Sequence, residues 1–221
     1  RNYWRRSRRL LEWFGYICVK EEKREYNIMK PYTLIKNFIG NETAHFLYEY
    51  LEFSTKVYIK EGDPQAKTGD EMVPGCLGPR SGDLTFDAFL KFMHSKVEDL
   101  TGLTLFPTYT YARLYTSGNA MPKHRDRPAC EYSLTLKLSD NRKGNWPIVI
   151  EDEEVFLDDG DAVLYKGCEV MHWRNKCEIE DYKLGQVFLH YVDANGPYAK
   201  ERYDGYYDKG IFFEKDLKEF L

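Results

Sequence analysis

The stretch Tyr111-Ala-Arg-Leu-Tyr-Thr-Ser-Gly118-Asn-Ala-Met-Pro-Lys-His124-Arg-Asp126 decides how this sequence is interpreted. It has the pattern of a strand, a glycine turn, and then a histidine and an aspartate two residues apart. Side chains at positions i and i+2 of an extended segment point to the same side. His124 and Asp126 are therefore predicted to aim an imidazole and a carboxylate at one point.

A third group that suits the same point lies in Val170-Met-His172-Trp-Arg174, 48 residues after His124. Two neutral imidazoles and one carboxylate, with the other coordination positions open, are the ligands that hold Fe(II) in non-haem oxygenases. A metal centre made of His124, Asp126 and His172 is the leading interpretation. Two alternatives compete with it. His124 and Asp126 could form a surface ion pair with His172 in the core, or His190 could be a ligand, although its strand position more simply points outward.

Short strands separated by turn signals dominate the sequence after residue 103. The expected strands are residues 108–115, 131–138, 146–151, 154–157, 162–165, 170–174 and 186–192. Many short strands at this spacing predict a sandwich or barrel, and the open mouth of a jelly roll suits a metal and a small ligand. Two amphipathic helices are expected before them, at residues 42–53 and 83–100. The predicted fold class is α+β, mainly β, with the helices packed on one outer face.

Three other segments carry expectations of their own. Residues 32–39 are expected to form a strand. Residues 54–82 are expected to form a long loop with one strand-like piece at 57–59, and loops of this length are more often functional or disordered than inert. This loop is a candidate lid. Residues 193–221 are rich in tyrosine and end in a helical pattern at 212–221, which is expected to cover an apolar face.

The net charge of −4 conceals an uneven distribution. Residues 1–28 contain eight basic and four acidic residues, whereas the rest of the chain contains 24 basic and 32 acidic residues. So acidic a body is not suited to hold a nucleic-acid backbone over a broad surface. Residues 1–28 are expected to be a basic tail outside the fold, with residues 29–221 forming one domain.

The cysteines and the apolar segments bear on the compartment. The five cysteines are odd in number and lack a CxxC spacing, so a disulfide framework or structural zinc site is not expected. No apolar run approaches the roughly 18–20 residues that cross a bilayer. A reducing, cytoplasmic environment without a membrane span is therefore expected.

The order of these motifs resembles the Fe(II)/2-oxoglutarate-dependent dioxygenases, in particular their prolyl 4-hydroxylase-like branch. The resemblance covers residues 108–193: the turn Tyr115-x-x-Gly118, the His124-x-Asp126 pair, the strand after Gly160 and then His172. It implies a double-stranded β-helix of the jelly-roll, cupin-like type, with Fe(II), 2-oxoglutarate and O2, and with ascorbate as an optional reductant. It makes His124, Asp126 and His172 both the metal ligands and the catalytic residues.

The resemblance also implies a cation that binds the far carboxylate of 2-oxoglutarate, and two residues compete for this role. Arg174 lies two residues after His172, so on a regular strand it faces the same interior. Lys183 lies 11 residues after His172, close to the family's usual spacing, but it precedes Gly185 and a turn. Strand parity slightly favours Arg174 over Lys183.

One position departs from the family pattern. Some prolyl hydroxylases have a cosubstrate-binding tyrosine three residues before the first histidine ligand, where this chain has Met121. Tyr111, Tyr115 and Ser133 are the candidates for the missing hydroxyl. The departure weakens proline as the substrate but not the cofactor assignment.

The function expected from the resemblance is hydroxylation of a C–H bond, with a peptidyl residue such as proline as the leading substrate. A small-molecule or free amino-acid hydroxylase is the alternative within the enzymes. A non-catalytic, metal-binding cupin-like interaction module is the alternative outside them. The sequence does not indicate an oligomeric state.

Overall fold

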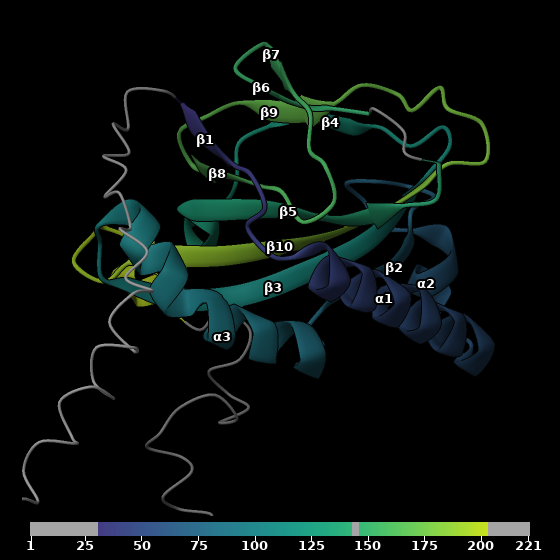
Figure 1. Ribbon diagram of the computed structural model, residues 1–221, viewed down its shortest axis with the longest axis horizontal. Helices are drawn as coiled ribbons and strands as arrows, with labels where there is room; N and C mark the ends of the chain where they lie inside the picture. Colours follow the sequence, from purple (N-terminus) through teal and green to yellow (C-terminus); the bar gives the residue numbers. More distant parts are fainter. Residues whose placement is uncertain (1–30, 143–145, 203–221) are drawn as a thin grey trace, which may run out of the picture.

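Two antiparallel sheets face each other in the computed structural model, which describes residues 31–142 and 146–202 (Figure 1). One has six strands in the order β1-β8-β5-β10-β3-β2, and the other has four in the order β4-β9-β6-β7. The strands are β1 (Tyr32–Ile35), β2 (Leu77–Ser81), β3 (Leu105–Thr116), β4 (Met121–His124), β5 (Tyr132–Asp140), β6 (Ile148–Ile150), β7 (Glu153–Val155), β8 (Ala162–Lys166), β9 (His172–Arg174) and β10 (Lys183–Asp193).

The chain passes repeatedly from one sheet to the other. From β3 onward it alternates between the sheets, except at the β6–β7 hairpin, which stays in the four-stranded sheet. This winding is that of a double-stranded β-helix and confirms the predicted fold class. All seven strands expected after residue 103 are present, with shifted ends.

The helices cover the outer face of the six-stranded sheet, as predicted (Figure 1). They are α1 (Asn41–Glu61), α2 (Pro64–Thr68) and α3 (Leu84–Thr101). Helix α3 begins where the sequence predicts, because the Asp83 carboxylate accepts hydrogen bonds from the backbone N–H groups of Thr85 and Phe86. Its apolar stripe packs into the main core with residues of α1, β3, β5 and β10. This layer leaves the opposite face of the sheet free to build the interior between the two sheets.

The expected long loop at residues 54–82 is wrong for most of its length. Helix α1 continues through residues 54–61 and ends at Gly62, which adopts a left-handed conformation. The strand-like piece expected at 57–59 is therefore part of this helix. Ser54 and Thr55 are buried where α1 packs on the sheet. Thr55 lies against Gly78 of β2, where an added Cβ would be 2.1 Å from Thr55 Oγ1. Only residues 69–76 connect α2 to β2 without a helix or strand.

Strand β1 is shorter than expected and ends at Ile35, although Phe38 and Ile39 are also buried. The expected basic tail at 1–28, the domain start at 29 and the helical pattern at 212–221 lie outside the described residues. Among the helices that the structure describes, none is long and apolar enough to cross a membrane.

Candidate metal centre

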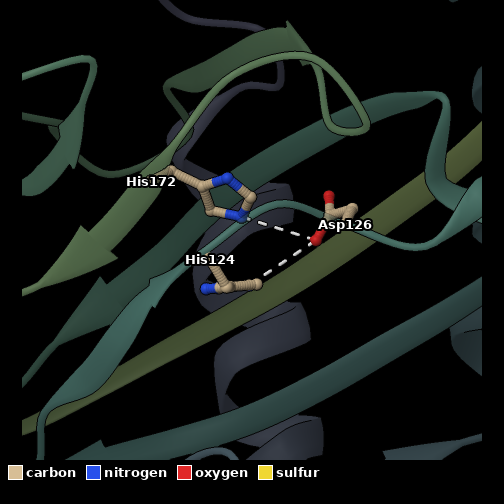
Figure 2. A group of neighbouring side chains, drawn as sticks. All are labelled: His124, Asp126 and His172. Atoms are coloured by element: carbon tan, nitrogen blue, oxygen red, sulfur yellow. Dashed lines mark ion pairs between the residues drawn. The ribbon is translucent and has the colours of Figure 1, made fainter.

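His124, Asp126 and His172 meet at one point between the two sheets (Figure 2). His124 ends β4 and His172 begins β9, and these two residues are paired across the antiparallel strands. Asp126 Oδ1 lies 3.6 Å from His124 Nε2 and 3.4 Å from His172 Nε2. Ligands about 2.1 Å from one ion, at right angles to each other, would be about 3 Å apart. The two separations from Asp126 Oδ1 exceed this value by about 0.4 and 0.6 Å, and the donor atoms of all three residues lie within 4.8 Å of one another, so they are grouped closely enough to share one metal ion.

Both histidine rings are oriented by the same kind of hydrogen bond. His124 Nδ1 lies 2.8 Å from the carbonyl oxygen of Pro122, and His172 Nδ1 lies 3.3 Å from that of Val170. A carbonyl oxygen can only accept, so each ring has a proton on Nδ1, and Nε2 is the nitrogen that faces Asp126 and can bind a metal when it is unprotonated. Such a bond commonly fixes the tautomer of a metal-binding histidine. The donor set fits a divalent metal.

The charges of the three residues suit cation binding. Burial alone would raise the pKa of Asp126, but hydrogen bonding with His124 and His172 outweighs it and holds that pKa well below its usual range. The carboxyl group is therefore ionised. For His124, burial lowers the pKa, but hydrogen bonds to Asp126 and Pro122 produce a net increase. The raised pKa favours the protonated form of His124 beside the carboxylate, and a metal ion bound at Nε2 would replace that proton.

Asp126 is also held from its other side. Ser133 Oγ lies 2.6 Å from Asp126 Oδ2 and 3.1 Å from His190 Nδ1. Burial lowers the pKa of His190 to about 4, so this imidazole is neutral near pH 7. Ser133 has one hydroxyl proton and donates it to the carboxylate, so its oxygen accepts the Nδ1 proton of His190. The expected outward orientation of His190 is wrong, because its side chain is buried beside the centre.

A second group that could hold a metal consists of Asp126, Cys130 and His190, whose donor atoms lie within 4.8 Å of one another. Burial raises the pKa of Cys130 to about 12, and its Sγ lies 3.0 Å from the hydroxyl oxygen of Tyr109. A thiol must lose its proton to bind a metal. This group also uses Asp126, so the His124–Asp126–His172 set is the stronger candidate.

The triad opens onto a cleft of about 560 Å³. Aromatic side chains and Met121 form part of its wall, and charged side chains stand at its rim. The aromatic residues are Tyr109, Tyr111, Tyr165 and Phe188, and the charged rim residues are Glu71, Arg125 and Arg127. Residues 70–72 also line the cleft. Part of the segment predicted as a lid therefore lies beside the triad.

The four residues predicted to bind a cosubstrate lie in different places. Tyr111 lines the cleft and donates a hydrogen bond from its hydroxyl to Asp70 Oδ2, at 2.6 Å. Tyr115 is fully buried, with its hydroxyl 3.8 Å from Met121 Sδ. The described residues that line the cleft include neither Arg174 nor Lys183.

Arg174 and Lys183 each have other partners. Arg174 faces the interior, as strand parity predicts, but it lies over the ring of Trp146 and donates from Nη1 to the Trp146 carbonyl oxygen at 2.6 Å. Lys183 begins β10 with its Nζ 3.2 Å from Glu52 Oε1 of α1.

Arg113 is the cleft residue that the sequence interpretation missed. It lies on β3 between Tyr111 and Tyr115, is 7% exposed, and lines the cleft with the triad. The signal was present in the sequence, because positions 111, 113 and 115 of a strand share one face. The sequence did not single out Arg113, because this residue has no characteristic spacing from His124 or His172.

Comparisons with known proteins agree on the fold alone. A scan against protein-family models finds no match, and a search of curated proteins finds no significant match in sequence. Solved structures do match. The alpha-ketoglutarate-dependent carbocyclase SnoK of nogalamycin biosynthesis aligns with a TM-score of 0.59 at 14% identity, over 88% of this chain and 90% of that one.

Two further structures match with similar scores. A prolyl-4-hydroxylase from Pseudomonas putida aligns with a TM-score of 0.53 at 14% identity, over 73% of this chain and 92% of that one. HygX from Streptomyces hygroscopicus, solved with nickel and 2-oxoglutarate bound, has a TM-score of 0.51 at 14% identity, over 75% and 84% of the two chains. This protein has the fold of the Fe(II)/2-oxoglutarate-dependent oxygenases. Within this fold, the three residues of the triad line the cleft.

Proposed function

We propose that this protein is an Fe(II)- and 2-oxoglutarate-dependent dioxygenase that hydroxylates a C–H bond. The observation that carries the proposal is the meeting of His124 Nε2, His172 Nε2 and Asp126 Oδ1 at one point beside an open cleft. Three protein ligands leave coordination positions open for a chelating 2-oxo acid and for oxygen. The bound structures among the fold neighbours, such as HygX with nickel and 2-oxoglutarate, support this choice of cosubstrate.

Each residue of the centre has a specific role in this proposal. Iron and 2-oxoglutarate, when bound, supply oxidative decarboxylation coupled to hydroxylation of the substrate. His124 and His172 present neutral Nε2 atoms because their Nδ1 protons are held by backbone carbonyl groups. Asp126 supplies one negative charge, and Ser133 fixes the direction of its carboxylate. The aromatic wall of the cleft limits water beside the reacting C–H bond.

A peptidyl residue, with proline as the leading candidate, is the proposed substrate class. A broad cleft with charged side chains at its rim suits a chain whose backbone and flanking side chains remain partly in solvent. The described cysteines, Cys76, Cys130, Cys168 and Cys177, are all free, which supports a reducing compartment such as the cytoplasm.

The proposal is tested by measuring turnover in assays from which the metal, the cosubstrate or the substrate is omitted in turn. Purified protein with Fe(II), 2-oxoglutarate and ascorbate is expected to form succinate, and a peptide library is expected to yield products heavier by one oxygen atom in mass spectrometry. Oxygen added only to free amino acids or small molecules would favour the alternative hydroxylase. Metal binding without succinate from any substrate would favour a non-catalytic, cupin-like module.

A further inference from the structure

Three polar side chains form a row across the inner face of the six-stranded sheet, beside the candidate metal centre. Gln186 of β10 is paired with Arg113 of β3 on one side and with Lys137 of β5 on the other. Residues paired across adjacent strands project from the same face of a sheet. Gln186 is fully buried, and Arg113 and Lys137 are each 7% exposed. The interior therefore contains two cations on either side of an amide, away from bulk solvent.

Four atoms in this row are buried without a hydrogen-bond partner among the described residues. They are Nε and Nη1 of Arg113, and Oε1 and Nε2 of Gln186. Buried donors and acceptors in native proteins nearly always have partners. One edge of the Arg113 guanidinium and the whole amide of Gln186 therefore lack hydrogen-bond partners among the described residues. This pattern indicates a site for a polar ligand.

The other interior or nearby cations have partners elsewhere. Lys137 Nζ lies 2.6 Å from Asp140 Oδ2 and 3.3 Å from Asp159 Oδ1. Lys183 pairs with Glu52. Arg174 donates to the Trp146 carbonyl oxygen, and although its Nε has no partner among the described residues, its side chain lies outside the residues that line the cleft. Arg113 combines the three required features, because it is charged, lines the cleft and has N–H groups to spare.

The Arg113 guanidinium is held in position by the cleft wall. Its Nη2 lies 3.2 Å from Asp70 Oδ2, the oxygen that also accepts the hydroxyl proton of Tyr111. The Cζ atom of Arg113 is 4.8 Å from the centre of the Tyr111 ring and 5.5 Å from the centre of the Phe188 ring. These contacts orient the planar group while Nε and Nη1 stay available. An oriented guanidinium is well suited to binding a carboxylate.

We propose that Arg113, which has the buried amide of Gln186 as its neighbour across the strands, binds the carboxylate of the 2-oxo acid cosubstrate that lies farthest from the metal. This inference rests on the proposed function and assigns the anchor to β3 rather than to Arg174 or Lys183. The ligand class is a dicarboxylate 2-oxo acid. A monocarboxylate such as pyruvate offers Arg113 no partner, so the residue sets the choice of cosubstrate.

Binding of 2-oxoglutarate and pyruvate to the Ni(II)-loaded full chain, measured by calorimetry, tests the proposal without turnover. Arg113→Gln is expected to raise the Kd of 2-oxoglutarate by on the order of 100-fold, as expected when a buried charge pair loses one partner. Its Kd for pyruvate should stay within about threefold of the wild-type value, since the affected carboxylate is missing. Gln186→Leu should weaken 2-oxoglutarate binding less than Arg113→Gln does, because Gln186 is paired with Arg113 across the strands but does not itself line the cleft.

Arg174→Gln and Lys183→Gln are the matched controls, and both are expected to keep the wild-type Kd for 2-oxoglutarate. The anchor assignment would be overturned if either control lost 2-oxoglutarate binding while Arg113→Gln kept it. It would also be overturned if Arg113→Gln lost Ni(II) or pyruvate to the same extent, because the residue would then be structural. If the wild-type chain bound Ni(II) but no 2-oxo acid, the proposed function would fail, and that result differs from a failure of the anchor alone.

Discussion

Ser133 Oγ lies 2.6 Å from Oδ2 of Asp126, the oxygen that faces away from both histidines of the triad. The same hydroxyl is 3.1 Å from the buried imidazole of His190. Oδ1 is thereby left to face the two Nε2 atoms. A partner of this kind around a metal ligand typically contributes 10- to 100-fold in metal affinity. The serine therefore orients the carboxylate of a candidate metal ligand in the metal-free protein.

Replacing Ser133 with Ala is expected to raise the Kd of a divalent metal by about 10- to 100-fold, because Asp126 would lose the bond that fixes its direction. Competitive titration with Co(II) or Fe(II) under anaerobic conditions measures this. Thr135→Ala is the matched control, since Thr135 lies two residues further along β5 and bonds to Tyr165, not to the triad. An equal effect of both substitutions would show that Ser133 has no special relation to Asp126.

Replacing Asp126 with Ala is expected to abolish 2-oxoglutarate turnover while the fold survives. The substitution removes the only carboxylate of the triad, and it also removes a buried charge whose partners are the two histidines. Succinate formation should therefore be lost, whereas the variant should still show a thermal unfolding transition. Turnover at the wild-type rate would end the metal assignment, and His124→Ala provides an independent repeat.

The stability of the metal-free protein is expected to fall as the pH decreases from about 6.5 to about 4, because of His190. Burial lowers the folded-state pKa of His190 to about 4, whereas the unfolded value is about 6.5. In this window the unfolded chain takes up a proton that the folded chain refuses, so acid favours unfolding by about 3 kcal/mol in total.

Urea unfolding in the presence of a chelator, repeated across this pH range, measures the slope. Neighbouring groups act in other windows: the raised pKa of His124 matters above pH 6.5, and the lowered pKa of Asp126 matters below pH 4. His190→Phe, which keeps an aromatic ring beside Tyr109, should flatten the profile between pH 4 and 6.5. An unchanged slope in that variant would assign the effect to another residue.

Replacing Gly78 with Ala is expected to destabilise the fold by about 2–4 kcal/mol, from overpacking added to a strained backbone. The new Cβ would lie 2.1 Å from Thr55 Oγ1, and Gly78 has φ +56°. Gly102→Ala is the control, because φ is +70° there but nothing lies within 4 Å of the added atom. The difference between the two variants in chemical denaturation isolates the contact between α1 and β2. Equal losses would mean that this contact does not constrain the helix.

Local patterns in the sequence were enough to predict the triad and most of the elements. The two-residue period of an extended segment predicted that His124 and Asp126 share one side, although β4 itself ends at His124. A capping aspartate with an apolar stripe defines α3. The same reasoning failed for residues 54–61, because Gly, Pro and charged residues further along 54–82 indicated a loop, whereas this part continues α1 and buries Ser54 and Thr55. Strand parity also correctly predicted that Arg174 faces the interior. It could not show that the Arg174 guanidinium would donate a hydrogen bond to the Trp146 carbonyl oxygen.

The sequence by itself determined that His124 and Asp126 lie on one side of the chain, because spacing along one extended segment is a local property of the backbone, whereas the pairing of β4 with β9 brings His172 to them. Only the tertiary structure decided that Arg113, and not Arg174 or Lys183, lines the cleft. That choice depends on the pairing of β3 with β10, which places Arg113 beside Gln186, and on the packing of α1, whose Glu52 binds Lys183. Such pairings join residues far apart in the chain, and they are set by the register of whole strands, including an irregularity in β10 between Gly185 and Gln186.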